Sequence, residues 1–157
     1  MNLNPDTTYI TRTLQELVRI NSANPSLSPE NPGETAVATT LARALKQLGL
    51  DVTLYEVAPG RSNVVGTLRG SGGGRSLLLN GHMDVVGPGD LTTWQHDPFG
   101  AQIENGMLYG RGSSDMKGAL ASMVYGAKML IDRQTPLHGE LYLVGVVQEE
   151  PCEGLGM

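Results

Sequence analysis

Two short, almost wholly apolar segments constrain the fold more than any other feature. Residues 77–79 read Leu-Leu-Leu, and residues 141–147 contain no charged side chain. Such uniform runs are typical of strands that are covered on both faces. Between and before them, residues 6–18, 32–48 and 115–130 carry apolar side chains at helical spacing. The alternation of helices with buried strands predicts a layered α/β domain.

Capping residues indicate where the first two helices begin and end. The first helix is expected to start near Asp6. For the second, Asn31 can serve as the cap, Pro32 suits the first helical position, and Glu34 lies three residues after the cap. Gly49 is expected to end this helix, since glycine adopts the left-handed conformation common at helix ends.

Four further strand regions follow from alternation and turn signals. Residues 52–57 alternate apolar and polar side chains, as a half-exposed strand does, and residues 63–68 form a second candidate. Residues 101–104 and 108–109 flank the dipeptide Asn105-Gly106. This dipeptide is a strong signal for a tight β-hairpin.

Size and charge exclude several classes of protein. The 157 residues fit one domain of ordinary size, and the net charge of −5 argues against a nucleic-acid partner, which requires a basic face. The apolar runs are far shorter than a membrane span, so no membrane partner is expected. Residues 1–8 show no export signal, and Cys152, as the single cysteine, excludes an internal disulfide. We therefore expect a cytoplasmic protein that acts on a small molecule.

His82 and Asp84 form the first candidate for chemistry. In an extended chain, residues two apart point to the same side. His82 can then ligate a metal through one ring nitrogen, while Asp84 holds the other and sets the ring angle. The alternative is a turn histidine capped by an aspartate.

Three more carboxylates lie near predicted element ends. Asp115 follows a glycine-rich segment and opens a helix, where it can bridge two cations or simply cap the helix. Glu149 and Glu150 follow the second apolar strand directly. One can bind metal while the other moves protons, or the pair can be a solvated acidic loop. In open α/β sheets, functional sites form beyond the carboxyl ends of strands, and these residues fall just beyond a predicted buried strand or at the start of a helix.

The ordered set of motifs resembles one known family. It comprises His82-x-Asp84, the segment 108–118 (LYGRGSSDMKG) and Glu149-Glu150, with Trp94 and Pro98-Phe99 between the first two. The set is similar to the co-catalytic zinc family of acetylornithine deacetylase, succinyl-diaminopimelate desuccinylase, aminoacylase and glutamate carboxypeptidase. The resemblance implies a three-layer α/β/α catalytic domain with a mixed, mostly parallel sheet, incomplete at its C-terminus.

The resemblance also implies a role for each matched residue. His82 would ligate the first zinc, Asp84 would orient His82, Asp115 would bridge both zincs, Glu149 would be the general base, and Glu150 would ligate the second zinc. Cobalt or manganese could replace zinc. The family further implies a cis peptide bond between Asp115 and Met116, and hydrolysis of an amide bond in an N-acyl amino acid or dipeptide.

Residues 1–157 would form the N-terminal portion of such a catalytic domain. The family's lid and dimerisation domain, a further acidic ligand and a late histidine have no counterpart here, and a homodimer is expected only of a full-length form. His96 and His138 precede Glu149 and do not match the late histidine. We therefore expect the isolated chain to bind zinc weakly and to turn over little. The alternative is a non-catalytic remnant, or a module that binds a metal or a partner.

Overall fold

The computed structural model describes residues 6–156. Residues 1–5 and residue 157 lie outside the described part, and so does most of the segment 1–8, in which the sequence shows no export signal. The helices are α1 (Thr7–Val18), α2 (Thr35–Gln47), α3 (Lys117–Asp132) and the short 3-10 helix η1 (Leu91–Thr93). The strands are β1 (Asp51–Ala58), β2 (Arg61–Leu68), β3 (Leu77–His82), β4 (Gln102–Glu104), β5 (Met107–Tyr109) and β6 (Leu141–Val146). None of the described helices is both long and apolar enough to cross a bilayer.

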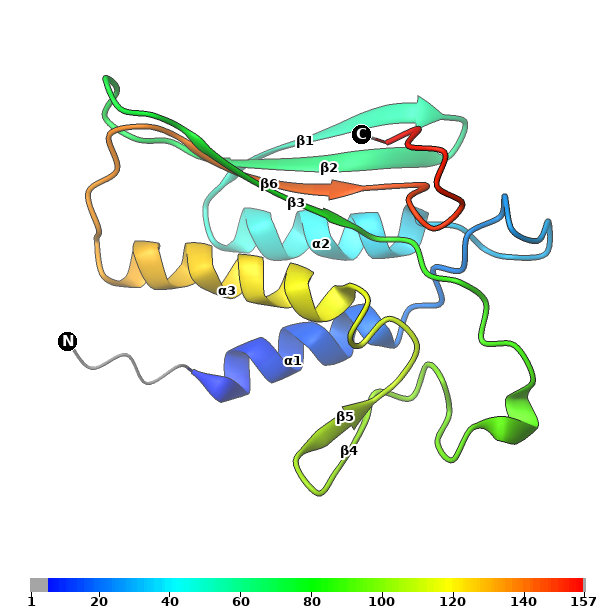
Figure 1. The fold of residues 1–157 in the computed structure, drawn as a ribbon. Helices are drawn as coiled ribbons and strands as arrows, with labels where there is room; N and C mark the ends of the chain where they lie inside the picture. The colour runs from blue at the N-terminus through cyan, green and yellow to red at the C-terminus, as the bar shows by residue number, and fades with distance from the viewer. Residues whose placement is uncertain (1–5, 157) are drawn as a thin grey trace.

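Four strands form a mixed sheet in the order β1-β2-β6-β3 (Figure 1). β1 with β2, and β2 with β6, run antiparallel, whereas β3 and β6 run parallel with His82 opposite Val146. The expected mixed α/β sheet is confirmed. Its expected parallel majority is not present among the described strands, because the β1–β2 hairpin enters the sheet beside β6 and reverses the direction there.

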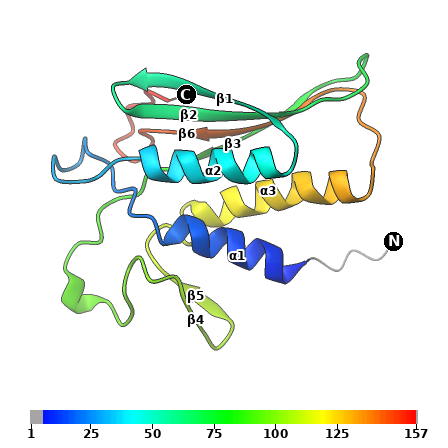
Figure 2. The same ribbon diagram turned by 180° about the vertical axis from the view of Figure 1, so that it is seen from behind.

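The helices lie on one face of this sheet (Figures 1 and 2). The core is formed by apolar side chains of α2, α3 and the inner strand faces, among them Leu41, Leu45, Val124 and Leu143. On the outer face Leu78 is 57% exposed. The expectation that residues 77–79 are covered on both faces is therefore wrong for the described residues, which place no helix over that side of the sheet.

The second helix begins later than its capping pattern predicts. α2 starts at Thr35, and Glu34 occupies the cap position without a side-chain capping bond. The Glu34 carboxylate is instead bonded to Arg61, and the Asn31 side chain donates to a loop carbonyl. Gly49 has φ +85° just after this helix, which confirms it as the stop.

The other local predictions agree with the structure. Asp6 caps α1, because its carboxylate accepts a hydrogen bond from the Tyr9 amide at 3.0 Å. Asn105 and Gly106 both have positive φ, as a type I′ turn requires, and they connect β4 to β5. The hairpin therefore forms where the dipeptide predicts it.

We predict that side chains buried on the helix-covered face of the sheet contribute most of the stability of this fold. Leu45 is fully buried between α2 and the sheet, so Leu45→Ala should lower the free energy of unfolding by about 2–5 kcal/mol. Leu54 is 50% exposed on β1, and Leu54→Ala, the matched control, should cost less than about 1 kcal/mol. Urea unfolding of both variants measures the difference. Equal losses would show that the core does not lie where the structure places it.

Candidate metal centre

The sheet topology brings three distant segments to one edge. β3 and β6 are parallel neighbours, so their carboxyl ends lie side by side, with His82 at the end of β3 and Glu149-Glu150 just beyond β6. Asp115 stands before the first turn of α3, which packs against β3 and β6. The predicted site residues are therefore brought together at the edge where open α/β sheets place their sites.

The side chains of this cluster converge on one nitrogen. His82 Nε2 lies 3.0 Å from Asp115 Oδ1 and 3.7 Å from Glu149 Oε2. His82, Asp115 and Glu150 each offer one ligand atom, and these three atoms lie within 4.8 Å of one another. The His82 side chain is only 6% exposed, whereas that of Asp115 is 78% exposed. The cluster thus has a buried imidazole on one side and carboxylates open to solvent on the other.

The His82 ring is held by the main chain of Asp84. Nδ1 donates to the Asp84 carbonyl oxygen at 3.0 Å, while the Asp84 carboxylate is 3.7 Å away. Because a carbonyl oxygen can only accept, this bond places the hydrogen on Nδ1 and leaves the Nε2 lone pair for a cation. The orienting contact predicted for the Asp84 carboxylate is made by its carbonyl.

The Asp84 carboxylate instead holds the acidic pair. It is fully buried and accepts hydrogen bonds from Asn24 Nδ2 at 2.6 Å and from the amides of Glu149 and Glu150, both at 3.1 Å. A buried carboxylate requires such donors, since it has lost its water. Asp84 therefore ties the turn after β6 to the turn after β3.

Asp115 does not act as a helix cap. α3 begins at Lys117, and Met116 occupies the cap position without a side-chain capping bond. The peptide bond between Asp115 and Met116 is cis, as predicted. Met116 Sδ accepts a hydrogen bond from the His82 amide, and a Cβ at Gly81 would lie only 2.9 Å from Met116 Cε. Glycine at position 81 thus lets Met116 pack against the end of β3.

Burial and neighbouring charges shift the pKa values of His82 and Glu150. Burial lowers the pKa of His82, but its bond to the Asp84 carbonyl and the nearby carboxylates of Asp115, Asp84 and Glu149 outweigh burial and raise the pKa above 6.5. Burial raises the pKa of Glu150, and the charges of Asp115 and Asp84 add to this, although His82 opposes it. Neighbouring carboxylates therefore favour the protonated form of both groups, and burial adds to this effect only for Glu150.

Two polar residues near the site had no role in the sequence prediction. Lys117 is fully buried, its ammonium group donates to the Ile20 carbonyl at 2.7 Å, and burial lowers its pKa to about 7. Asn24, which lies in the loop after α1, bonds Asp84 across 60 positions. Lys117 could have been singled out because it lies within the motif segment 108–118. No periodic pattern in the sequence points to Asn24.

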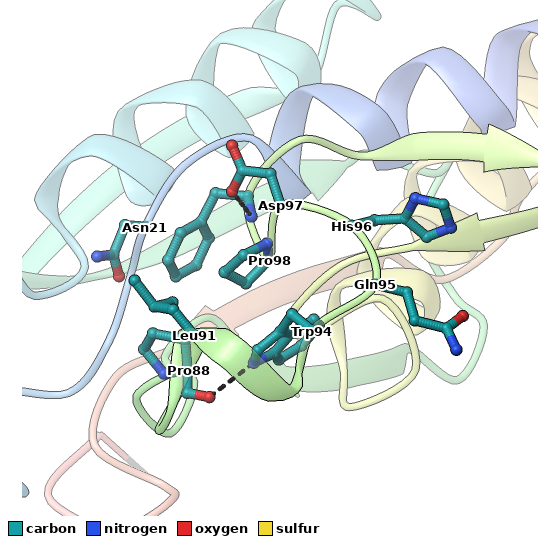
Figure 3. A pocket seen from close by; sticks show the side chains of 9 residues that line it. Asn21, Pro88, Leu91, Trp94, Gln95, His96, Asp97 and Pro98 are labelled. Carbon is teal, nitrogen blue, oxygen red and sulfur yellow. Dashed lines mark hydrogen bonds between the residues drawn. The ribbon is translucent and has the colours of Figure 1, made fainter.

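A separate cavity of about 630 Å³ lies beside the loop that follows β3 (Figure 3). Pro88, Leu91, Trp94 and Phe99 form its apolar wall, and Trp94 Nε1 donates to the Pro88 carbonyl at 2.8 Å. None of the cluster residues lines this cavity. The segment around Trp94 therefore forms a hollow of its own.

The other two histidines are placed elsewhere. His96 lies in a loop, with Nε2 3.2 Å from a carboxylate oxygen of Glu104, and His138 lies in the loop before β6 near Ser71. Neither belongs to the group of potential metal ligands found within residues 6–156. His82 is therefore the histidine of the site in the described part of the chain.

The donor set fits a divalent cation. One imidazole nitrogen and two carboxylates converge, which are the ligand types of zinc, and the carboxylates also suit manganese. The acidic groups around a single imidazole leave the cluster short of positive charge, which a cation would supply. A mixed α/β domain with such a cluster beyond its strand ends has the organisation of a metal-dependent hydrolase.

Comparison with known proteins agrees with this class. The family described as Peptidase family M20/M25/M40 matches residues 78–157, which is about half of the chain and includes the whole cluster. The chain belongs to this family. Its members are hydrolases that typically depend on two metal ions. The expected family is thereby confirmed, whereas the acetylornithine deacetylase-like subgroup stays a prediction.

Individual relatives are similar to this chain over most of its length. It is 36% identical over 146 residues to the N-formyl-4-amino-5-aminomethyl-2-methylpyrimidine deformylase of Bacillus subtilis, covering 88% of this chain and 34% of that protein. The enzyme of the same name from Halalkalibacterium halodurans is also 36% identical, with 89% and 33% covered. The chain thus spans about a third of the length of the curated relatives it matches.

Solved structures show the same fold. The M20 family metallo-carboxypeptidase Sso-CP2 from Sulfolobus solfataricus superimposes with a TM-score of 0.76 at 26% identity, covering 87% of this chain and 30% of that one. Human carnosine dipeptidase 1 gives a TM-score of 0.72 at 23% identity, with 87% and 31% covered. The mixed α/β fold is therefore that of M20 catalytic domains.

We predict that the metal affinity of this site decreases as the pH falls, because protons compete with the metal for His82. A cation needs the neutral imidazole, so affinity is lost as pH falls through the His82 pKa, which lies above 6.5 in the metal-free protein. Zinc affinity, measured by competition with a chromophoric chelator, should begin to fall at a higher pH than it would for a histidine with an ordinary pKa. An affinity that begins to fall only below the ordinary histidine range would contradict the raised pKa.

Proposed function

We propose that the chain supplies part of a two-zinc centre that hydrolyses an amide bond in a small N-acyl compound. The convergence of His82, Asp115 and Glu150, with Glu149 beside them, is the single observation that carries this proposal. Membership of a hydrolase family supports it. The cytoplasmic location and a homodimer of the full-length protein belong to the same proposal.

Each ligand residue has a suitable position. His82 would bind one ion through Nε2, Glu150 would bind the other, and Asp115, whose carboxylate has two oxygens, would bridge them. The donors suit zinc best and admit cobalt or manganese. When bound, the ions act as Lewis acids that lower the pKa of water and stabilise negative charge on the substrate oxygen.

Glu149 is the candidate general base. Its carboxylate is 40% exposed and approaches His82 Nε2 to 3.7 Å, while its amide is held by Asp84. It can therefore accept a proton from the attacking water and return that proton to the leaving amine. Asp84 and the main chain around it keep Glu149 in place while these transfers occur.

The names of the relatives support a substrate class. Two of them are named as deformylases of an N-formyl pyrimidine compound, and a structural neighbour is a dipeptidase. We therefore propose a small acyl group, such as formyl, acetyl or succinyl, on the nitrogen of a small amine or amino acid. This widens the deacetylase or desuccinylase activity expected from the motifs by adding the formyl group. Dipeptides are the alternative substrates in a screen.

The two adjacent glutamates should separate catalysis from metal binding. Glu149→Gln should retain metal and lose about 10²–10⁴-fold in kcat, because only the proton acceptor is removed. Glu150→Gln should lose metal first, since it removes one of the three converging ligand atoms. Zinc content by elemental analysis and turnover of N-formyl, N-acetyl and N-succinyl amines are measured on both variants.

These variants are matched controls for one another, because each exchanges a carboxylate for an amide at adjacent positions of the same turn. Equal zinc loss in both would remove the distinction between base and ligand. An unsubstituted protein, expressed as its natural reading frame encodes it, that neither binds zinc nor cleaves any of these amides would overturn the proposed function.

A further inference from the structure

Two buried carboxylates hold the main chain of the acidic turn. The amide of Gln148 donates to Glu34 Oε1 at 3.3 Å, and the amides of Glu149 and Glu150 donate to Asp84. Glu34 and Asp84 are both fully buried. β6 ends at Val146, and Gln148, two residues further on, has φ +60°, which turns the chain away from the direction of the strand. Three successive amides of the turn are thus bonded to side chains from other elements.

A hydrogen-bonded path connects these two carboxylates. Arg61 at the start of β2 donates to Glu34 through Nε at 2.9 Å and through a second guanidinium nitrogen, which is a bidentate pair. The same guanidinium donates to Asn24 Oδ1 at 3.2 Å and to the side chain of Gln148. Asn24 in turn donates to Asp84 at 2.6 Å. The path therefore runs from Glu34 through Arg61 and Asn24 to Asp84.

Stability alone does not account for this arrangement. The Glu34 side chain is 0% exposed and that of Arg61 is 12% exposed, and desolvating such a pair offsets most of its attraction. Glu34 also makes no capping bond to α2, although it stands at the cap position. Its acceptor atoms are used by Arg61 and by the amide of Gln148. Both members of the pair therefore form hydrogen bonds to Gln148 in the turn.

We propose that Arg61 and Glu34 are positioning residues for the metal-binding turn. Through Gln148, and through Asn24 and Asp84, they set the main-chain positions from which Glu149 and Glu150 extend. Neither residue belongs to the cluster of potential ligands itself. This inference rests on the function proposed above and extends it to residues that lie outside the family motifs.

Arg61→Lys is the direct test, in the protein as its natural reading frame encodes it. Lysine keeps the positive charge but cannot bond Glu34, Asn24 and Gln148 with one planar group. Zinc affinity should fall by about 10–100-fold, as is usual when a residue behind a metal ligand is changed. The kcat should fall more than KM changes, and the visible spectrum of the cobalt(II)-substituted protein should change.

Arg69→Lys is the matched control. Arg69 is 67% exposed and pairs with Asp51 at 2.7 Å and with Glu140 at 3.1 Å, on the surface of the sheet. Its substitution should leave zinc affinity, the cobalt(II) spectrum and kcat unchanged. Thermal unfolding of the metal-free variants separates a loss of positioning from a loss of folding. If Arg61→Lys does not fold, Glu34→Gln, which has the same shape, is measured with the same readouts.

The outcomes distinguish this inference from the function on which it rests. If the unsubstituted protein binds zinc and turns over, but the Arg61 variant matches the Arg69 variant in zinc affinity, spectrum and kcat, the positioning role is overturned alone. If the unsubstituted protein binds no zinc, the proposed function and this inference are both overturned. A selective loss in the Arg61 variant, with metal-free stability retained, supports the inference.

Discussion

The contact on which the site depends is made by the buried carboxylate of Asp84. It accepts hydrogen bonds from the amides of Glu149 and Glu150 and from Asn24. A carboxylate without water is unfavourable unless several donors surround it, and here three converge. Because β3 and β6 are parallel neighbours, their ends are close enough for one side chain to join them. The position of the acidic pair relative to His82 follows from this contact.

The site has a buried half and an open half. His82 is buried, its ring is fixed by the Asp84 carbonyl, and Met116 packs against the end of its strand. Asp115, by contrast, has a side chain that is 78% exposed. Carboxylates gathered around one imidazole repel one another, and a cation would relieve that repulsion. The Glu149 side chain is also open to solvent, with 40% of its surface exposed.

Much of the fold was predictable because its signals are local. The capping carboxylate of Asp6, the stop at Gly49 and the Asn105-Gly106 turn each depend on residues a few positions apart. The direction of strands and the face that helices cover depend on the whole topology. The leucines at 77–79 illustrate this limit, since a uniform apolar run cannot reveal that one face of the sheet has no helix over it among the described residues.

For the site, the motif residues were predictable and their supports were not. His82, Asp115 and Glu150 converge, as their positions beyond strand ends or at the start of a helix predict. Asn24 bonds Asp84, and Arg61 bonds Asn24, both across long sequence separations and by polar contacts that no periodicity encodes. The central claim is that this cluster binds two metal ions. Anomalous X-ray diffraction at the zinc edge, on crystals of the protein encoded by the natural reading frame, tests it most directly. The account predicts two peaks bridged by Asp115, with His82 beside one and Glu150 beside the other. Peaks that avoid these three residues, or no peak in zinc-soaked crystals, would contradict it.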